Sequence, residues 1–320
     1  MSVMFKIFLL FTTAFFVYKA SEVLIYSFKL LTKDGFLEKF FVAAIFAGIA
    51  TSLPEIFVAI SSSLENVPSL SIGNALGSNI ADLAFVVPLA IFLSGNIARV
   101  NRENFSRKNA LLLLTSTVLP FMLVLDRVLS FYDGLFLIFM FFVYAVYLFS
   151  KKDRHGLFSF LGRVRRMLSK PHFWKGIFGL FVSLVILIIG SEVIVKLALS
   201  LSSDLDLSVF VAGLVFVALS TSLPELFVAT AALAKGEDEI FFGDILGSLV
   251  TNANLVIGLS VLRRPVVFLD LSSYAVSVVI LFLVLALFYI FALTKRKIEK
   301  WEAAVLFASY LLFLILEKIL

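Results

Sequence analysis

Thr51-Ser52-Leu53-Pro54-Glu55 is a motif that returns unchanged as Thr221-Ser222-Leu223-Pro224-Glu225. Each copy lies inside a long apolar run, where a carboxylate costs about 3 kcal/mol or more and seldom lacks a function. The proline before each acid has no N–H to donate, so a helix must break or unwind there. Irregular backbone at membrane depth is tolerated only where it is buried in protein or lines a cavity. Hydroxyls, carbonyls and a carboxylate are the oxygen ligands that Ca²⁺ and Na⁺ prefer, so the pair predicts one ion site made of two halves.

The composition is that of a membrane protein with several spans. Its 320 residues are 61% hydrophobic and 15% charged, and the mean hydropathy is +1.08, far above that of a soluble domain. The absence of cysteine excludes disulfides, thiolate metal sites and thiol nucleophiles. The net charge of +5 does not indicate nucleic-acid binding, because the basic residues lie in the loops between apolar runs. No cleavage site follows the first apolar run, so we expect it to be retained as a helix.

Apolar runs of about 20 residues predict ten transmembrane helices, and therefore an all-α integral membrane fold. A basic segment, residues 151–172, separates two sets of five. It predicts a cytoplasmic linker with a short amphipathic helix at the membrane surface, and we interpret its two histidines, His155 and His172, as solvated linker residues. The expected spans are 3–31, 36–63, 69–95, 108–126 and 130–150, then 173–202, 207–234, 239–262, 265–293 and 299–318.

The two sets are copies of one unit. Residues 21–23, 51–55, 73 and 77–78 match residues 170 positions later, with no gap between residues 21 and 92, which indicates an internal duplication. Because each unit has an odd number of spans, the second copy enters the membrane from the opposite side. Inverted repeats are typical of secondary transporters with a substrate site at the midplane. We therefore expect a first repeat at 1–150 and a second at 173–320, with the site motifs at 48–82 and 218–252.

Lysine and arginine concentrate on the side of the linker, which predicts that the linker is cytoplasmic and that both termini lie outside a plasma membrane. Lys19 is an exception, because it falls inside a span. It lies one turn from Glu22, and we expect a local ion pair between the two side chains rather than a part in the ion site.

The motif blocks resemble the two alpha-repeats of the sodium/calcium exchanger family. Residues 50–55 followed by 73–79, and residues 220–225 followed by 243–248, carry this resemblance. It implies exchange of Na⁺ for Ca²⁺ by alternating access, with four cation positions between the second, third, seventh and eighth helices. It also implies that the first and sixth helices slide as a gate. No cofactor is expected, the partners are the two ions and the bilayer, and a monomer is sufficient although the oligomeric state is left open.

The resemblance implies a ligand set at matching positions, in which Glu55 and Glu225 are the essential acids. For each hydroxyl in the set, a hydrogen bond to the carbonyl of the preceding turn is the structural alternative. A further group of polar residues, Asp244, Asn74 and Asn79, is predicted to line the ion path. The other implied ligands are Thr51, Ser52, Thr221, Ser222, Ser78, Ser248, Asp82 and Asn252, with the backbone carbonyls of Gly48 and Ala218.

The sequence departs from the family pattern at three points. Ala50 and Ser220 stand where glycine is usual, which leaves the backbone less free. Asp82 and Asn252 are exchanged relative to familiar microbial relatives, although one acid and one amide remain. Asp244 replaces an expected amide, and its alternative role is that of an acid favoured by the dipole at a helix start.

Other functions fit the sequence less well. An ion channel does not need two broken helices with one carboxylate each. An enzyme is disfavoured because the spans contain no histidine and no HExxH motif. Among transporters, Ca²⁺/H⁺ exchange and potassium-dependent Na⁺/Ca²⁺ exchange remain open, as do stoichiometry and direction.

Overall fold

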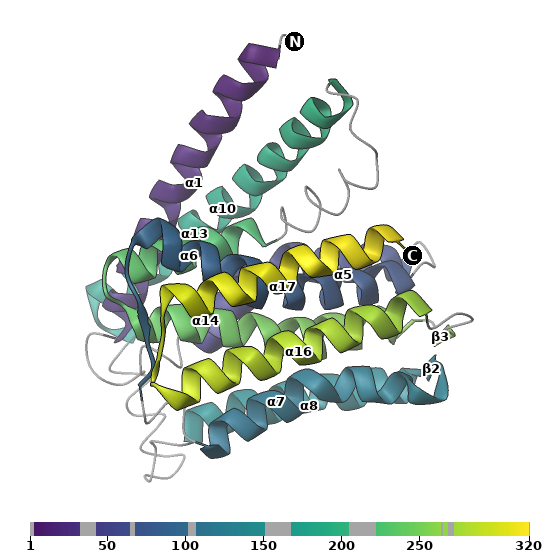
Figure 1. Ribbon diagram of the computed structural model, residues 1–320. Helices are drawn as coiled ribbons and strands as arrows, with labels where there is room; N and C mark the ends of the chain where they lie inside the picture. The colour runs from purple at the N-terminus through teal and green to yellow at the C-terminus, as the bar shows by residue number, and fades with distance from the viewer. Residues whose placement is uncertain are drawn as a thin grey trace.

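The computed structural model describes residues 3–32, 43–64, 68–101, 107–150, 168–204, 222–263, 265–267 and 272–319. A described helix occupies every one of the ten predicted spans (Figure 1). The first five spans are α1 (Val3–Thr32); η1 (Ala43–Ala47), α3 (Gly48–Thr51) and α4 (Leu53–Leu64); α5 (Pro68–Ala81), η2 (Asp82–Val86) and α6 (Val87–Ser94); α7 (Arg107–Leu123) with η3 (Val124–Asp126); and α8 (Phe131–Ser150). The second five are α10 (Pro171–Asp204); α13 (Leu223–Ala234); α14 (Asp238–Val250), η5 (Thr251–Val256) and α15 (Ile257–Val261); α16 (Ser272–Thr294); and α17 (Lys300–Ile319).

The helices form an all-α integral membrane fold. Within the described residues, five helices are long and apolar enough to cross a membrane, judged by length and composition. Burial within the protein separates them into central and peripheral helices: in the apolar 18-residue stretch of each helix, 94% is buried within 238–261, against 22% within 131–148 and 28% within 171–190. The central helix is therefore surrounded by protein. The other two candidates are Ile72–Ser94 and Tyr274–Thr294.

The first motif helix breaks where the sequence predicts, and the described part of the second begins at the equivalent residue. In the first copy, α3 ends at Thr51 and α4 begins at Leu53, with Ser52 between them at φ −84° and ψ 12°. In the second copy, Ser222 precedes α13 with φ −88° and ψ 5°. The matching dihedral angles follow from the same cause, because Pro54 and Pro224 cannot donate a backbone hydrogen bond.

Two short antiparallel strand pairs join distant parts of the chain. The strand β1 (Ala98–Arg99) pairs with β4 (Lys297–Ile298), and β2 (Val128–Leu129) pairs with β3 (Val266–Val267). Each pair unites a segment of residues 1–150 with a segment of residues 173–320. The pairing also follows the duplication, because β1 corresponds in sequence position to β3 and β2 to β4.

α1 and α10 lie side by side and cross the other helices at a steep angle (Figure 1). Glycines on α10 permit this close packing: a Cβ added at Gly176 would lie 3.1 Å from the Leu31 side chain, and one at Gly179 would collide with Ser27. These two helices therefore pack chiefly on each other.

Candidate functional site

Four spans place polar side chains at the centre of the molecule. The broken helix α3–α4 carries the first motif, and α13 carries the second. The neighbouring helices α5 and α14 are each followed by a π-helical segment, η2 and η5, which begin at Asp82 and Thr251. π-Helical turns often occur at functional sites, and here they hold the sequence-equivalent residues Asp82 and Asn252.

Most of the predicted site residues are buried almost completely. Eleven of the described side chains are at most 1% exposed, which excludes an ordinary solvated role for these charged and polar groups. A buried charge requires a counter-charge or a bound cation. The buried members are Thr51, Ser52, Glu55, Ser78, Asn79, Asp82, Ser222, Glu225, Asp244, Ser248 and Asn252.

Hydrogen bonds link the motif to the neighbouring helices. Ser78 donates its hydroxyl to Oε1 of Glu55 at 3.1 Å. The Thr51 hydroxyl bonds to the Ala47 carbonyl one turn earlier at 3.0 Å, which is the structural alternative expected for such a hydroxyl. The same oxygen also lies 3.2 Å from Asp244 Oδ1 and 3.2 Å from Ser248 Oγ, so Thr51 connects the two halves of the chain as well.

Four carboxyl groups gather in this region and interact electrostatically. Glu225 interacts with Glu55, Asp82 and Asp244, and Asp82 interacts with Glu55 and Asp244. Within the described residues, both oxygens of Asp82, both of Glu225 and Oδ2 of Asp244 have no hydrogen-bond partner. The Ser222 hydroxyl lies near Asp82 but outside hydrogen-bonding geometry. These oxygens are therefore available to bind cations.

The carboxyl groups do not form a compact metal cluster by themselves. In the part of the chain that the structure describes, no three histidine or acidic side chains come close enough together to hold one metal ion. A cation bound here must take hydroxyl, amide or carbonyl oxygens as well. Such mixed oxygen ligation suits Ca²⁺ and Na⁺.

The two halves of the site meet at a crossing of small residues. A Cβ on Gly48 would lie 2.7 Å from Gly247 Cα and 2.8 Å from the Ser248 nitrogen. Only glycine fits at this point, because the two backbones are in contact. The crossing brings Thr51 within reach of Ser248 and Asp244, a contact that sequence spacing alone does not reveal.

Asp244 does not lie at a helix start. It is the seventh residue of α14 and is fully buried, whereas the helix dipole acts mainly within the first turn. The helix-start interpretation of Asp244 is therefore wrong, and its contact with Thr51 places it beside the site. Asn74 is only half-buried on α5, and Thr221 and Ala218 lie outside the described residues.

Lys19 makes the local contact that the sequence predicts. Its Nζ lies 2.9 Å from Glu22 Oε2, and its side chain is 53% exposed. Lys19 is thus not among the buried groups of the site.

The family model for the sodium/calcium exchanger protein matches residues 5–150 and 175–317. This chain belongs to the sodium/calcium exchanger protein family. The family consists of membrane cation antiporters, not enzymes.

Relatives of the exchanger family match over most of the chain. Inner membrane protein YrbG of Escherichia coli (strain K12) is 31% identical over 258 residues, which cover 78% of this chain and 77% of that protein. Sodium/calcium exchanger MaX1 of Methanosarcina acetivorans is 26% identical, with 94% and 95% covered. The solved structure of the sodium-calcium exchanger NCX_Mj, soaked with Na⁺ and Ca²⁺, superposes with a TM-score of 0.80 at 24% identity, covering 97% of this chain and 98% of that one. That likeness establishes the shared fold.

Proposed function

We propose that this exchanger moves Ca²⁺ in one direction and Na⁺ in the other across the plasma membrane, by alternating access to one midplane site. The observation that carries the proposal is the pair of matching motifs, in each of which a helix begins one residue before the proline and carries a buried glutamate, Glu55 or Glu225. One motif comes from each half of the chain. Two acids brought together in this way provide the charge that a divalent ion requires.

The proposed ligands are the motif hydroxyls and acids together with the polar residues of the adjacent helices. Ser78 already contacts Glu55, and Thr51 already contacts Ser248, so small rotations of these hydroxyls bring their oxygens onto a cation. Asp82 and Asn252 add one charge between them. Thr221 and the carbonyls of Gly48 and Ala218 complete the set by sequence position.

The proposed topology has two inverted repeats, residues 1–150 and 173–320, joined by a cytoplasmic linker. The two strand pairs support it, since inversion about a membrane-plane axis converts the β1–β4 pair into the β3–β2 pair. Both termini then lie outside. The close pairing of α1 with α10, the first helices of the two repeats, supports their movement as one gate (Figure 1).

The counter-ion is the part of the proposal that experiment must decide first. Carboxylates serve protons as well as metal ions, so Ca²⁺/H⁺ exchange and potassium-dependent exchange are the competing transport modes. A cation channel is the competing function of another class. It is disfavoured because four buried carboxyl groups surrounded by protein bind an ion strongly, whereas conduction requires that the ion also leaves easily.

Purified protein in liposomes loaded with radioactive calcium provides the test. We expect external Na⁺ to release calcium and an imposed membrane potential to change the rate, since each net charge moved is worth about 2.3 kcal/mol per 100 mV. Release driven equally well by a proton gradient without Na⁺ would reassign the counter-ion. Calcium flux without any counter-ion would instead indicate a channel.

A further inference from the structure

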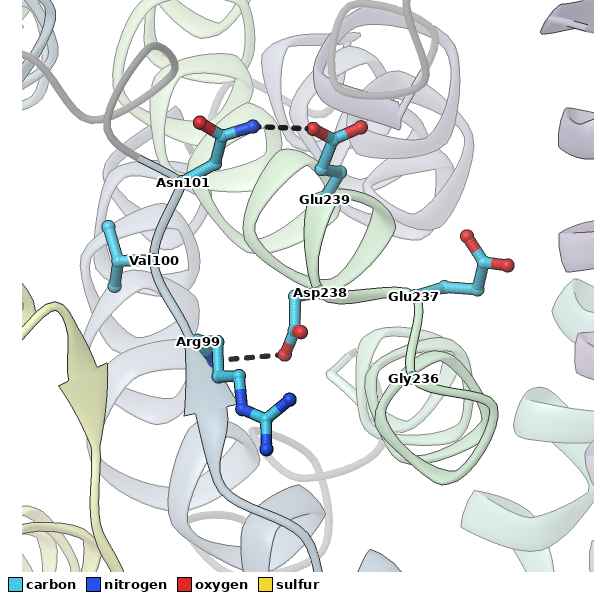
Figure 2. A pocket seen from close by; sticks show the side chains of 7 residues that line it. All are labelled: Arg99, Val100, Asn101, Gly236, Glu237, Asp238 and Glu239. Carbon is cyan, nitrogen blue, oxygen red and sulfur yellow. Dashed lines mark hydrogen bonds between the residues drawn. The ribbon is translucent and has the colours of Figure 1, made fainter.

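The turn between α13 and α14 is anchored on one side by two hydrogen bonds. Gly236 has a φ of +68°, which lets the chain reverse within a few residues. Asp238 Oδ1 accepts from the backbone N–H of Arg99 at 2.9 Å, and Glu239 Oε1 accepts from Asn101 Nδ2 at 2.7 Å. These bonds hold the turn against the segment that follows α6, around a cavity of about 320 Å³ (Figure 2).

Glu237 points away from that segment (Figure 2). Its Oε1 lies 2.6 Å from Nζ of Lys29, near the end of α1. A second ion pair joins the same two parts of the molecule, because Lys235 Nζ lies 3.4 Å from Oε1 of Glu22 on α1. The turn is thus fixed to the body of the protein on one side and ion-paired with α1 on the other.

The signs of the charges specify one register of α1. Along α1, Glu22 precedes Lys29 by seven residues, or about 10 Å at 1.5 Å per residue. In the turn the base comes first, with Lys235 before Glu237. Each charge of the turn therefore faces the opposite charge on α1. Sliding α1 until Lys29 approached Lys235 would exchange an attraction for a repulsion. The pairs therefore favour the observed position of α1 over a displaced one.

From this geometry we infer that Lys235 and Glu237 form an electrostatic latch, which holds α1 in the observed register against α13 and α14. The inference rests on the proposed function in one respect, since alternating access is what requires α1 to move with α10. α10 packs on α1 through Gly176 and Gly179, so a latch on α1 restrains both helices. Releasing the latch then changes the fraction of molecules in which α1 and α10 occupy the observed position.

The expected effect is moderate because the paired side chains are partly exposed. Lys29 is 40% and Glu237 13% exposed, and Lys235 and Glu22 are 33% and 28% exposed. Ion pairs of this kind shift an equilibrium about 2- to 5-fold each, and less at high salt. Such a shift changes the population of a gate position without preventing transport.

The absence of native cysteine allows a direct measurement of the α1 position. Spin labels at Tyr26→Cys on α1 and Ile290→Cys on α16, both more than half exposed, report their separation by pulsed electron resonance in liposomes. We expect Glu237→Gln to broaden or shift the distance distribution, and the exchange Lys29→Glu with Glu237→Lys to restore it. A distribution unchanged in Glu237→Gln and in Lys235→Gln would overturn the latch.

Lys297→Gln is the matched control. It removes the 2.5 Å ion pair with Glu299, whose side chains are about as exposed as those of the latch pairs. That pair does not involve α1, so the distance distribution should equal that of the parent. An equal effect in this control would also contradict the latch. The distance measurement needs no calcium or sodium transport, so its outcome is separate from that of the exchange assay. Where exchange is present, we expect Glu237→Gln to change apparent cation affinity about 2- to 5-fold in opposite directions at the two faces.

Discussion

The side-chain amide of Asn79 donates to the backbone carbonyl of Leu249 at 3.4 Å, across a separation of 170 residues. That separation equals the offset of the internal duplication, so Asn79 contacts its own counterpart. In the proposed inverted-repeat topology, equivalent residues touch only near the axis that relates the two repeats. On that topology the contact puts the axis between α5 and α14, beside Ser78 and Ser248, with the candidate site around it.

Removing either motif charge should abolish calcium exchange. Glu55→Gln and Glu225→Gln keep the volume of the side chain but remove one of the negative charges that a divalent ion needs in a protein interior. Calcium uptake into sodium-loaded liposomes is the measurement, with Glu302→Gln, a buried acid on α17, as the control outside the site. Uptake near the parent level in either motif variant would exclude a site built from both halves.

Asp82 and Asp244 should affect apparent calcium affinity more strongly at the cytoplasmic face than at the outer face. In the proposed topology each lies four residues, about 6 Å, to the inner side of its neighbouring serine, and Asp244 accepts a hydrogen bond from Thr51. We expect Asp82→Asn and Asp244→Asn to raise the half-saturating calcium concentration at the inner face more than at the outer face. Oriented vesicles provide the measurement, and equal shifts at both faces would contradict it.

The crossing of α3 and α14 should tolerate no added atom. Gly48→Ala would place a methyl group 2.7 Å from Gly247 Cα, and overpacking of this kind costs about 1 to 3 kcal/mol. We expect a lower midpoint of thermal unfolding in detergent, together with loss of exchange. Gly73→Ala is the matched control on α5, because an added Cβ there has no neighbour within 4 Å among the described residues. A stable, active Gly48→Ala variant would show that the helices do not approach this closely.

Glu299 predicts a pH effect that is confined to acid. Hydrogen bonds from Lys297, Trp301 and Lys295 lower the pKa of Glu299 from 4.5 to about 2. A lowered pKa contributes stability that is present above the unfolded value and is lost as the pH falls toward the folded value. The difference in stability between the parent and Glu299→Gln should thus be constant above about pH 4.5 and shrink below it. Unfolding midpoints measured from pH 3 to pH 7 would check this, and a difference that changed between pH 6 and pH 7 would contradict it.

The sequence by itself determined the ten helical spans and their order. Apolar length places the spans because a bilayer core has a fixed thickness, and described helices occupy all ten predicted positions. Pro54 locates the break between α3 and α4, and Pro224 locates the start of α13, because a missing N–H acts locally, whatever the rest of the chain does. The repeat offset is likewise a property of the chain alone, and it supplied the correspondence between Ser78 and Ser248.

Only the tertiary structure decided which of these residues meet. Asp244 is separated from Thr51 by 193 residues, and no spacing rule joins them. Their contact depends on the close approach of Gly48 and Gly247. The ion pairs of Glu237 and Lys235 with α1 are equally invisible in the sequence, where the three acids 237–239 resemble a solvated turn. Long-range contacts of this kind depend on how whole helices pack, which is a property of all the packed surfaces together, whereas hydrophobic length and proline breaks depend on neighbouring residues only.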